Sequence, residues 1–378
     1  MNKATMSAEP RAKAPLRHTL VDLLDRFGVV ILALLILLVL PLSLDMFRLG
    51  LAAKYLCFAF PAVGIVLIWG YGGILSLGQG VFFGLGSYMM AMFLKLESAA
   101  NPDSSSGTAL SAFFGAAGLP DFMVWNSVEE LPLFWEPFHH VWITLPAIII
   151  LPPLFAFIVG YVNFRNRVSG VYFTIVTLSI SAIMAIVIIG QQGYTGGING
   201  ITDFKTFLGL DLDNDQAKYV MYYITAVLLL VAVLFGRFIL RSRLGRVLVA
   251  IRDQEDRVRF SGYDSAMFKA FIFAVGALFA SVGGAMFTIQ VGLASPSLVG
   301  IVPSIEMVIY AAVGGRVSLI GAVYGAFLVN AAKTGFSENF VEYWTYFIGG
   351  LYVIVVMFLP WGLAGILDKL RGSGRSSR

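Results

Sequence analysis

Long apolar runs alternate with shorter polar segments along most of this 378-residue chain. A helix that crosses the ~30 Å hydrocarbon core of a bilayer needs about 20 predominantly apolar residues, and most of the runs approach or exceed that length. The runs cover residues 27–44, 54–69, 70–94, 141–162, 171–190, 219–236, 267–290, 304–333 and 342–363. The pattern predicts an all-α polytopic membrane protein.

The run at 304–333 is interrupted by Gly314, Gly315 and Arg316. A single crossing would leave Arg316 in mid-membrane, where an arginine costs about 2.5–3.5 kcal/mol. We therefore predict two arms that meet at Gly314–Ser318, with Arg316 near the cytoplasmic face. This arrangement gives about 10 transmembrane helices, or 8 plus a re-entrant hairpin, and places the N- and C-termini in the cytoplasm.

The polar segments differ in charge. Residues 237–269 hold eight basic and four acidic side chains, whereas residues 97–139 hold six acidic ones and neither lysine nor arginine. Loops rich in lysine and arginine stay in the cytoplasm, so the first segment is predicted to be a cytoplasmic loop and the second an extracytoplasmic one. The rest divides into a cytoplasmic N-terminal tail (1–26), a membrane domain (27–367) and a cytoplasmic C-terminal tail (368–378).

The composition agrees with a membrane location. Hydrophobic residues make up 58% of the chain and charged residues 13%, whereas soluble domains are roughly 45–50% apolar and about 25% charged. The net charge of +4 reflects the cytoplasmic loops, because no soluble segment carries a basic stripe with interleaved aromatic side chains. We therefore expect the lipid bilayer, and no nucleic acid, as a partner.

Several kinds of chemistry lack their motifs in this sequence. The pattern G-x-x-x-x-G-K-[ST] is absent, so we do not expect the chain to bind and hydrolyse ATP. His18, His139 and His140 lack the spacing of metal ligands, and the single cysteine, Cys57, excludes an internal disulfide. We predict a chain that is not an enzyme and binds neither a metal nor a cofactor.

The run at 70–94 is rich in glycine, and Ser76 and Gln79 lie within its densest part. Glycine lets membrane helices approach closely, but the same density can interrupt a helix whose backbone is buried or lines a cavity. This glycine-rich stretch can therefore serve helix packing alone, or it can form part of a substrate path. Residues 72–77 and 314–319 share the pattern GGxxSL, a six-residue match that chance can produce.

Neutral polar side chains follow the apolar run at 171–190, and we expect them at the extracytoplasmic mouth of a transport path. They are Gln191, Gln192, Thr195 and Asn199. A small uncharged polar solute needs paired donors and acceptors, because an unmet hydrogen bond in a dry site costs on the order of 1–3 kcal/mol. A turn-rich loop whose glycine and asparagine residues serve only the backbone is the alternative.

Glu306 is the one carboxylate that we place at the edge of the bilayer. Ionisable residues within a membrane are functional candidates, so we add Glu306 to the candidate substrate path. The alternative is a carboxylate at the start of a helix, where the helix dipole favours it.

The loop at 237–269 contains the pattern of an amphipathic helix. Leu244, Val247, Leu248 and Ile251 recur at helical spacing, and a dense charged run follows. Such a helix can lie on anionic headgroups as a positive-inside loop. It can also dock onto a cytoplasmic partner.

Several segments resemble one family of transport proteins. GRVLVAIRDQEDRVRFSGYD, from Gly245, resembles the cytoplasmic coupling loop of permease subunits of branched-chain amino-acid and urea-type ABC importers. GYGGILSLGQGVFFGLGSY, from Gly70, resembles the same family, and YTGGINGI fits its general pattern. PDFMVWN, ELPLFWEPF and TDFKTFLGLDL resemble the urea branch, so the chain resembles a permease subunit of a urea-type ABC importer.

This resemblance implies a multi-pass protein of the bacterial inner membrane that works with several partners. They are a second related permease subunit, two ATP-binding subunits that use the ATP, and an extracytoplasmic solute-binding protein. In the family, a short helix of the coupling loop sits in a groove of the ATP-hydrolysing subunit. The coupling residues predicted on this basis are Gly245, Arg246, Ile251, Arg252, Glu255, Arg257, Gly262 and Tyr263.

Urea is the first substrate that we expect, and branched-chain amino acids are the alternative. A zwitterion would benefit from a fixed charge or an exposed helix terminus at its site, and the lack of a clear intramembrane arginine or lysine favours urea weakly. The rival classes are a passive urea channel, which needs no large charged cytoplasmic helix, and an ion-coupled carrier, which usually has more intramembrane carboxylates or histidines.

Overall fold

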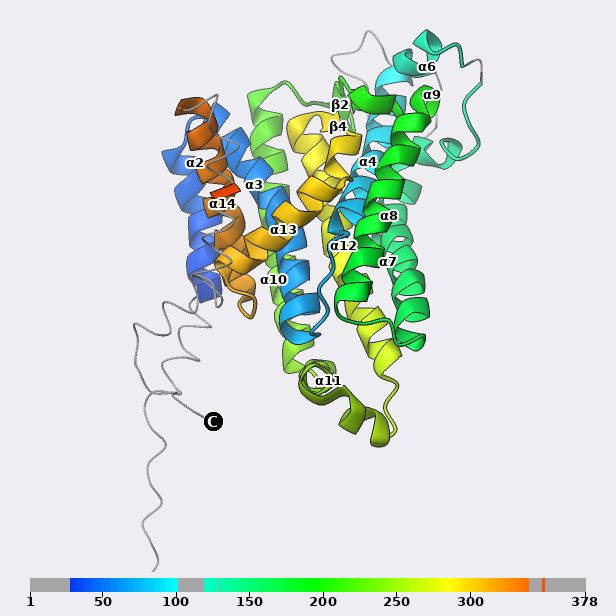
Figure 1. Cartoon of the computed structure of the whole chain (residues 1–378). Coiled ribbons are helices and arrows are strands. Elements are labelled where there is room, and N and C mark those ends of the chain that lie inside the picture. The colour runs from blue at the N-terminus through cyan, green and yellow to red at the C-terminus, as the bar shows by residue number, and fades with distance from the viewer. Residues whose placement is uncertain (1–27, 101–118, 129, 340–348, 351–378) are drawn as a thin grey trace, which may run out of the picture.

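The computed structural model describes residues 28–100, 119–128, 130–339 and 349–350, which form a bundle of helices (Figure 1). The long helices are α3 (Met46–Ile65), α4 (Gln79–Ala100), α7 (Val141–Arg165), α8 (Val171–Gly190), α10 (Asp215–Arg241), α12 (Ser265–Val291) and α14 (Leu319–Asn339). The shorter ones are η1 (Leu35–Val39), α2 (Leu40–Ser43), η2 (Val66–Tyr71), α6 (Asp121–Trp125), η3 (Glu136–His139), α9 (Gln192–Thr195), η4 (Gly197–Asn199), α11 (Arg243–Phe260), η5 (Pro296–Leu298) and α13 (Ile301–Gly314). In Figure 1, α11 lies beyond one end of the bundle, which we call the inner end because the charge pattern predicts it to be cytoplasmic; the opposite end is the outer end.

The predicted all-α class is confirmed for the described residues, whereas the count of ten crossings is not. The helices long and apolar enough to cross a membrane are Met46–Tyr71, Val141–Arg165, Val171–Gly190, Asp215–Arg241, Ser265–Val291 and Leu319–Ser337. Two shorter apolar helices, Gly28–Ser43 and Ile301–Gly314, accompany them. Both predicted tails and nearly all of the run at 342–363 lie outside the described residues.

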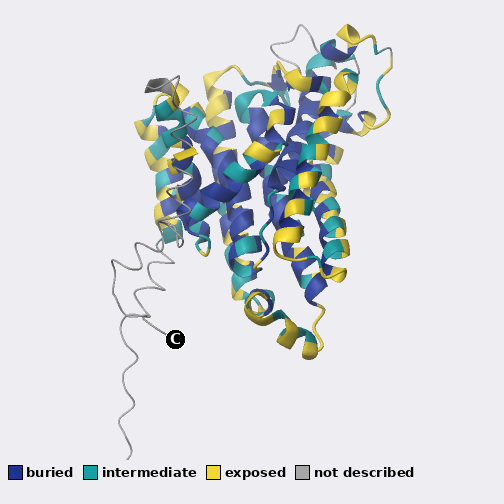
Figure 2. Ribbon diagram, viewed as in Figure 1, coloured by how far each residue is buried: buried dark blue, intermediate teal, exposed yellow. Residues whose placement is uncertain are grey.

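Helix α12 forms the centre of the bundle and packs against α3, α4 and α7. In the most apolar stretch of α12, 83% of the residues are buried, whereas the corresponding share is 28% in α7 and in α8. Buried residues fill the interior in Figure 2, and exposed ones cover the outer surface. The exposed side chains of α7 and α8 are largely apolar, so these two helices present a surface suited to hydrocarbon.

The predicted break between two arms is confirmed. Helix α13 ends at Gly314 and α14 begins at Leu319, with Gly315 at φ 118°, a conformation that glycine adopts readily. The arms are unequal, because α13 has 14 residues and α14 is long enough to cross the membrane. Figure 1 shows α13 running obliquely from within the bundle toward this turn.

The turn between α13 and α14 contacts the end of η2. A Cβ atom on Gly70 would lie 1.8 Å from the carbonyl oxygen of Arg316, so only glycine fits there. The hydroxyl of Tyr71 donates a hydrogen bond to the carbonyl of Val317 over 2.7 Å. The two segments that share GGxxSL thus begin at helix breaks that lie side by side.

Short strands connect the loops at the outer end. They are β1 (Ile201–Thr202), β2 (Thr206–Phe207), β3 (Leu210–Asp211) and β4 (Leu293–Ala294). β1 pairs antiparallel with β4, and β2 with β3. The carboxylate of Glu97 accepts hydrogen bonds from the backbone N–H groups of Leu208 and Gly209 over 3.1 and 2.8 Å. Because α4 continues to Ala100, the first residues of the predicted outer segment at 97–139, Glu97 among them, belong to the helix.

Candidate functional site

The chain between η2 and α4 is not helical, although it lies within the bundle. Hydroxyl groups of α8 bind the unwound backbone. Thr174 Oγ1 donates to the carbonyl of Leu75 over 2.8 Å, and the N–H of Leu77 donates to Thr177 Oγ1 over 3.2 Å. These bonds replace some of the helical hydrogen bonds that are lost at the break. Contacts with α8 therefore stabilise the predicted interruption of the helix.

Gln79 begins α4 and is fully buried, with 0% of its surface exposed. Neither its amide nitrogen nor its amide oxygen has a hydrogen-bond partner among the described residues. Tyr88 and Trp135 each leave one polar atom unpaired, whereas Gln79 leaves two, the amide nitrogen and the amide oxygen. An unmet buried group costs about 1–3 kcal/mol, so this carboxamide requires an explanation such as a transient ligand.

Buried serines surround the start of α4. The N–H of Gly80 donates to Ser304 Oγ of α13 over 3.0 Å, and the hydroxyls of Ser304 and Ser181 lie 3.1 Å apart. Ser181, on α8, also donates to the carbonyl of Val299. The start of α4 therefore lies where α4, α8 and α13 meet, and the side chains that contact its backbone are hydroxyl groups that carry no charge.

Ser76 lies in the unwound segment before Gln79 and is 3% exposed, and its place in a substrate path stays a prediction. Its hydroxyl lies 3.4 Å from the N–H of Gly78, which donates to it. Sequence reasoning missed Thr177, Ser181 and Ser304. They come from apolar runs distant in the sequence, where a hydroxyl bonded to its own helix is ordinary.

The predicted outer-mouth residues lie apart from this region, at the outer end. Gln191, Gln192 and Asn199 are exposed on the turn formed by α9 and η4. Thr195 Oγ1 donates to the carbonyls of Ile188 and Gln191 over 2.6 and 2.8 Å, which closes the end of α8. A role for these four residues in the path stays a prediction.

Glu306 forms a different cluster. Its carboxylate accepts from Lys333 Nζ of α14 over 2.8 Å and from the hydroxyl of Tyr310 over 3.1 Å. Glu306 follows Ser304 by two residues, which a helix places on nearly opposite faces. Lys333 is thus the partner of Glu306, and the place of Glu306 in a substrate path stays a prediction.

Glu306→Ala is expected to lower the free energy of unfolding by about 1–2 kcal/mol, because Lys333 would keep a partly buried charge without its carboxylate. Glu306→Gln should lose less, since the amide oxygen still accepts. Thermal unfolding of the purified protein in detergent measures both changes. Adding Lys333→Met to Glu306→Ala should recover most of the loss, and an unchanged midpoint for Glu306→Ala would show that the pair does not stabilise the fold.

Helix α11 is the amphipathic helix predicted at the inner end. Ser242 caps it, accepting from the N–H of Leu244 over 3.2 Å. The residues that it buries are Gly245, Leu248 and Ile251. Gln254 has non-helical backbone angles (φ −151°, ψ 81°), so the helix kinks there. The connecting segment is shorter than the predicted loop at 237–269, because both ends of that range belong to α10 and α12.

Arg252 connects α11 to the broken helix. Its Nη1 donates to the carbonyl of Gly70 over 2.7 Å, and its Nε donates to Asp253 over 2.9 Å. Gly73, at φ 68°, lies against the same side chain, since a Cβ there would be 2.8 Å from Arg252 Cγ. The residue predicted from the coupling motif therefore contacts the segment that leads to Gln79.

Glu255 connects α11 to α12. Its carboxylate accepts from Lys269 Nζ, from Arg259 Nη2 over 2.8 Å and from Ser265 Oγ over 2.9 Å. Burial alone would raise the pKa of Glu255, but the hydrogen bond and charge of Lys269, together with Ser265 and Arg259, outweigh it and lower the pKa below its usual range. This residue thus ties the helix to the centre of the bundle.

Glu255→Gln is expected to remove most of the acid sensitivity of this junction. Because the folded-state pKa is lowered, the ionised carboxylate stabilises the fold above the usual pKa and loses that effect as pH falls through the folded value. Thermal midpoints in detergent between about pH 6 and pH 3 measure the effect. The midpoint of the wild type should fall more steeply than that of Glu255→Gln, and parallel curves would contradict the prediction.

The remaining predicted coupling residues lie on the surface. Arg246, Arg257, Gly262 and Tyr263 are exposed. Phe260, which sequence reasoning missed, is 93% exposed at the end of α11. Its exposure could not be read from the sequence because the kink at Gln254 sets the direction of the last turn.

Comparison with known proteins decides the family. The family model described as the permease component of branched-chain amino acid transport systems matches residues 47–357, most of the chain. The chain belongs to this permease family. No solved structure matches it.

Individual relatives agree with this assignment. The permease is 25% identical over 357 residues to the Escherichia coli high-affinity branched-chain amino acid transport system permease protein LivM, covering 88% of this chain and 74% of LivM. It is 24% identical to BraD of Pseudomonas aeruginosa, covering 82% and 91% of the two chains. A shorter match, 28% identical over 36% of this chain, is to the E. coli xylose transport system permease protein XylH.

Membership fixes the general role of the permease. Permease components of this family are transport subunits of ABC transporters and not enzymes, and they work with other permease subunits and ATP-binding subunits. The apolar helices of the described residues agree with a multi-pass membrane protein of a bacterial inner membrane.

Proposed function

We propose that this permease carries a small neutral polar solute inward, with urea as the first candidate and branched-chain amino acids as the second. The observation that carries the proposal is the fully buried carboxamide of Gln79, which has no partner among the described residues. It offers hydrogen-bond donors and an acceptor, as does a urea-like amide, so each can satisfy the other.

The side chains around the start of α4 favour a neutral solute. Ser76, Thr177, Ser181 and Ser304 are hydroxyl groups, each at most 3% exposed. Hydroxyls orient a polar solute without the counter-charge that a zwitterion needs. The charged residue nearest to Ser304 in sequence, Glu306, has Lys333 as its own partner. Branched-chain amino acids remain the second candidate because LivM and BraD are named for their transport.

The same geometry supports movement driven by partner subunits. A partner that displaces α11 would act on the break beside Gln79 through Arg252 and Gly70, and on α12 through Glu255 and Lys269. Such a change between two arrangements is what alternating access requires. The partners in this proposal are a second related permease, two ATP-binding subunits and an extracytoplasmic solute-binding protein, with ATP bound by the partners alone.

Uptake by a reconstituted complex tests the proposal. The permease is assembled with its partner subunits in vesicles, and uptake of labelled urea and of labelled leucine is measured with ATP, with ADP, and with the permease alone. ATP-dependent uptake of urea supports the first candidate, and ATP-dependent uptake of leucine alone supports the second. Full uptake by the permease alone without nucleotide would establish a passive channel and overturn the proposed mechanism.

A further inference from the structure

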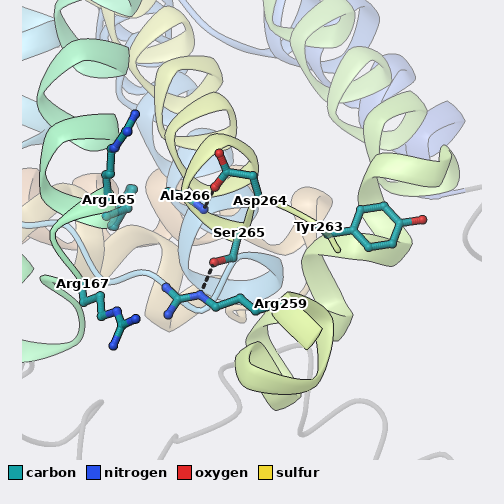
Figure 3. A pocket seen from close by; sticks show the side chains of 8 residues that line it. Arg165, Arg167, Arg259, Tyr263, Asp264, Ser265 and Ala266 are labelled. Carbon is teal, nitrogen blue, oxygen red and sulfur yellow. Dashed lines mark hydrogen bonds between the residues drawn. The ribbon is translucent and has the colours of Figure 1, made fainter. Parts of the chain in front are cut away.

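A pocket of about 250 Å³ opens at the inner end, between the turn that joins α7 to α8 and the turn that joins α11 to α12. Figure 3 shows the side chains around it, with Arg165 and Arg167 from the end of α7 and the turn after it, and Arg259 from α11. The lining residues are Phe164, Arg165, Arg167, Arg259, Tyr263, Asp264, Ser265 and Ala266.

The pocket carries an excess of positive charge. Asp264 caps the N-terminus of α12, because its carboxylate accepts hydrogen bonds from the N–H groups of Ala266 and Met267 over 3.0 and 3.4 Å. Arg259 binds Ser265 and Glu255, and Arg165 donates to the hydroxyl of Tyr161 over 2.8 Å. Each guanidinium has further N–H groups available.

Arg167 differs from its neighbours. Its backbone N–H donates to the carbonyl of Phe164 over 3.1 Å. Its side chain is exposed and forms no hydrogen bond or ion pair with any residue that the structure describes. Its backbone is left-handed, at φ 61°, a conformation that is uncommon outside glycine, asparagine and aspartate. The turn therefore presents an unpartnered cation at the pocket.

The pocket lies at the depth of lipid headgroups. Arg165 is the last residue of α7, and α8 begins at Val171, so both helices leave the membrane here. Their adjoining outer faces are apolar and exposed, including Val162 at 53%, Val171 at 73% and Tyr172 at 76%. A ligand that fits this combination has an anionic group for the arginines and long apolar chains for the helix faces.

We propose that this pocket binds the phosphate of an anionic phospholipid of the inner leaflet, whose acyl chains lie along α7 and α8. Arginine suits a phosphate because its planar N–H groups donate in pairs. An acidic side chain of a partner protein would satisfy the charge but would not require the apolar faces that continue from the pocket. The site adjoins Glu255 through Arg259, so a bound lipid would also brace the junction of α11 and α12.

Native mass spectrometry of the full permease tests the proposal, with phosphatidylglycerol and phosphatidylcholine of identical acyl chains as probes. Wild type should prefer phosphatidylglycerol. An arginine near an anionic headgroup strengthens binding by roughly fivefold, so Arg165→Gln with Arg167→Gln should weaken phosphatidylglycerol binding about 25-fold. The matched control, Arg241→Gln with Arg243→Gln, removes the same charge from exposed inner-end positions outside the pocket and should leave the preference unchanged.

Arg167→Gln alone guards against misfolding of the double variant, because its side chain has no described partner to lose; it should weaken binding roughly fivefold. Equal losses in the control pair, or no preference in the wild type, would overturn the proposal. Glycerol phosphate competing as well as the lipid at equal concentration would show a free-anion site. Loss of the bound lipid when the ATP-binding subunits assemble would assign the pocket to a protein partner. Either result also rejects the lipid.

Discussion

Gln79→Leu is expected to lower solute uptake by roughly tenfold to a hundredfold while leaving the fold at least as stable. The leucine removes one donor–acceptor pair from the proposed site, and an unmet hydrogen bond there costs about 1–3 kcal/mol. It also removes a buried carboxamide that has no partner among the described residues, which by itself favours the folded state. Loss of transport without loss of stability separates a solute-binding side chain from a structural one.

The measurement pairs uptake per folded protein with the thermal midpoint in detergent. Gln290→Leu is the matched control, because the amide of Gln290 is partly buried on α12 and donates to Thr225 Oγ1 over 2.9 Å. This control should behave in the opposite way, with a lower midpoint and unchanged uptake. If Gln79→Leu instead lowered the midpoint and transported normally, Gln79 would be a packing residue and the proposed site would be wrong.

Local features of the fold could be predicted because they depend on short stretches of sequence. The apolar run at 171–190 coincides with α8, the glycine-rich segment before Gln79 is unwound, and the chain breaks after Gly314. The buried face of α11 contains Leu248 and Ile251, as helical spacing predicted. Each of these outcomes follows from hydrophobic length, glycine content or helical period.

Contacts between distant segments could not be predicted in the same way. Ser304 reaches the N–H of Gly80 across 224 positions, and Lys333 reaches Glu306 across 27. The first contact required α13 to lie against α4, and the second required two unequal arms at the break. Apolar periodicity specifies that helices bury a face, but it does not specify which serine of that face meets which backbone.

Arg252→Glu is expected to abolish most uptake while the assembled complex still hydrolyses ATP. The substitution removes the hydrogen bond from the guanidinium to the carbonyl of Gly70 and places a carboxylate beside that carbonyl. A hydrogen bond to a charged group contributes about 1.5–3 kcal/mol, so a loss of at least tenfold in uptake is expected. Its neighbour across the kink, Glu255, would still hold α11 to α12, so movement of α11 would no longer reach the break beside Gln79.

Two comparisons show whether Arg252 acts through that contact. Arg243→Glu makes the same charge change at an exposed position of the same helix, and it should leave the ratio of uptake to ATP hydrolysis unchanged. Arg257→Glu, also exposed, should weaken co-purification of the ATP-binding subunits and lower uptake and hydrolysis together. If Arg252→Glu reduced both activities in proportion, the residue would serve assembly and not transmission. If it reduced neither activity, the contact between Arg252 and Gly70 would not transmit the movement of α11. The contact of Glu255 with α12 would then have to transmit that movement.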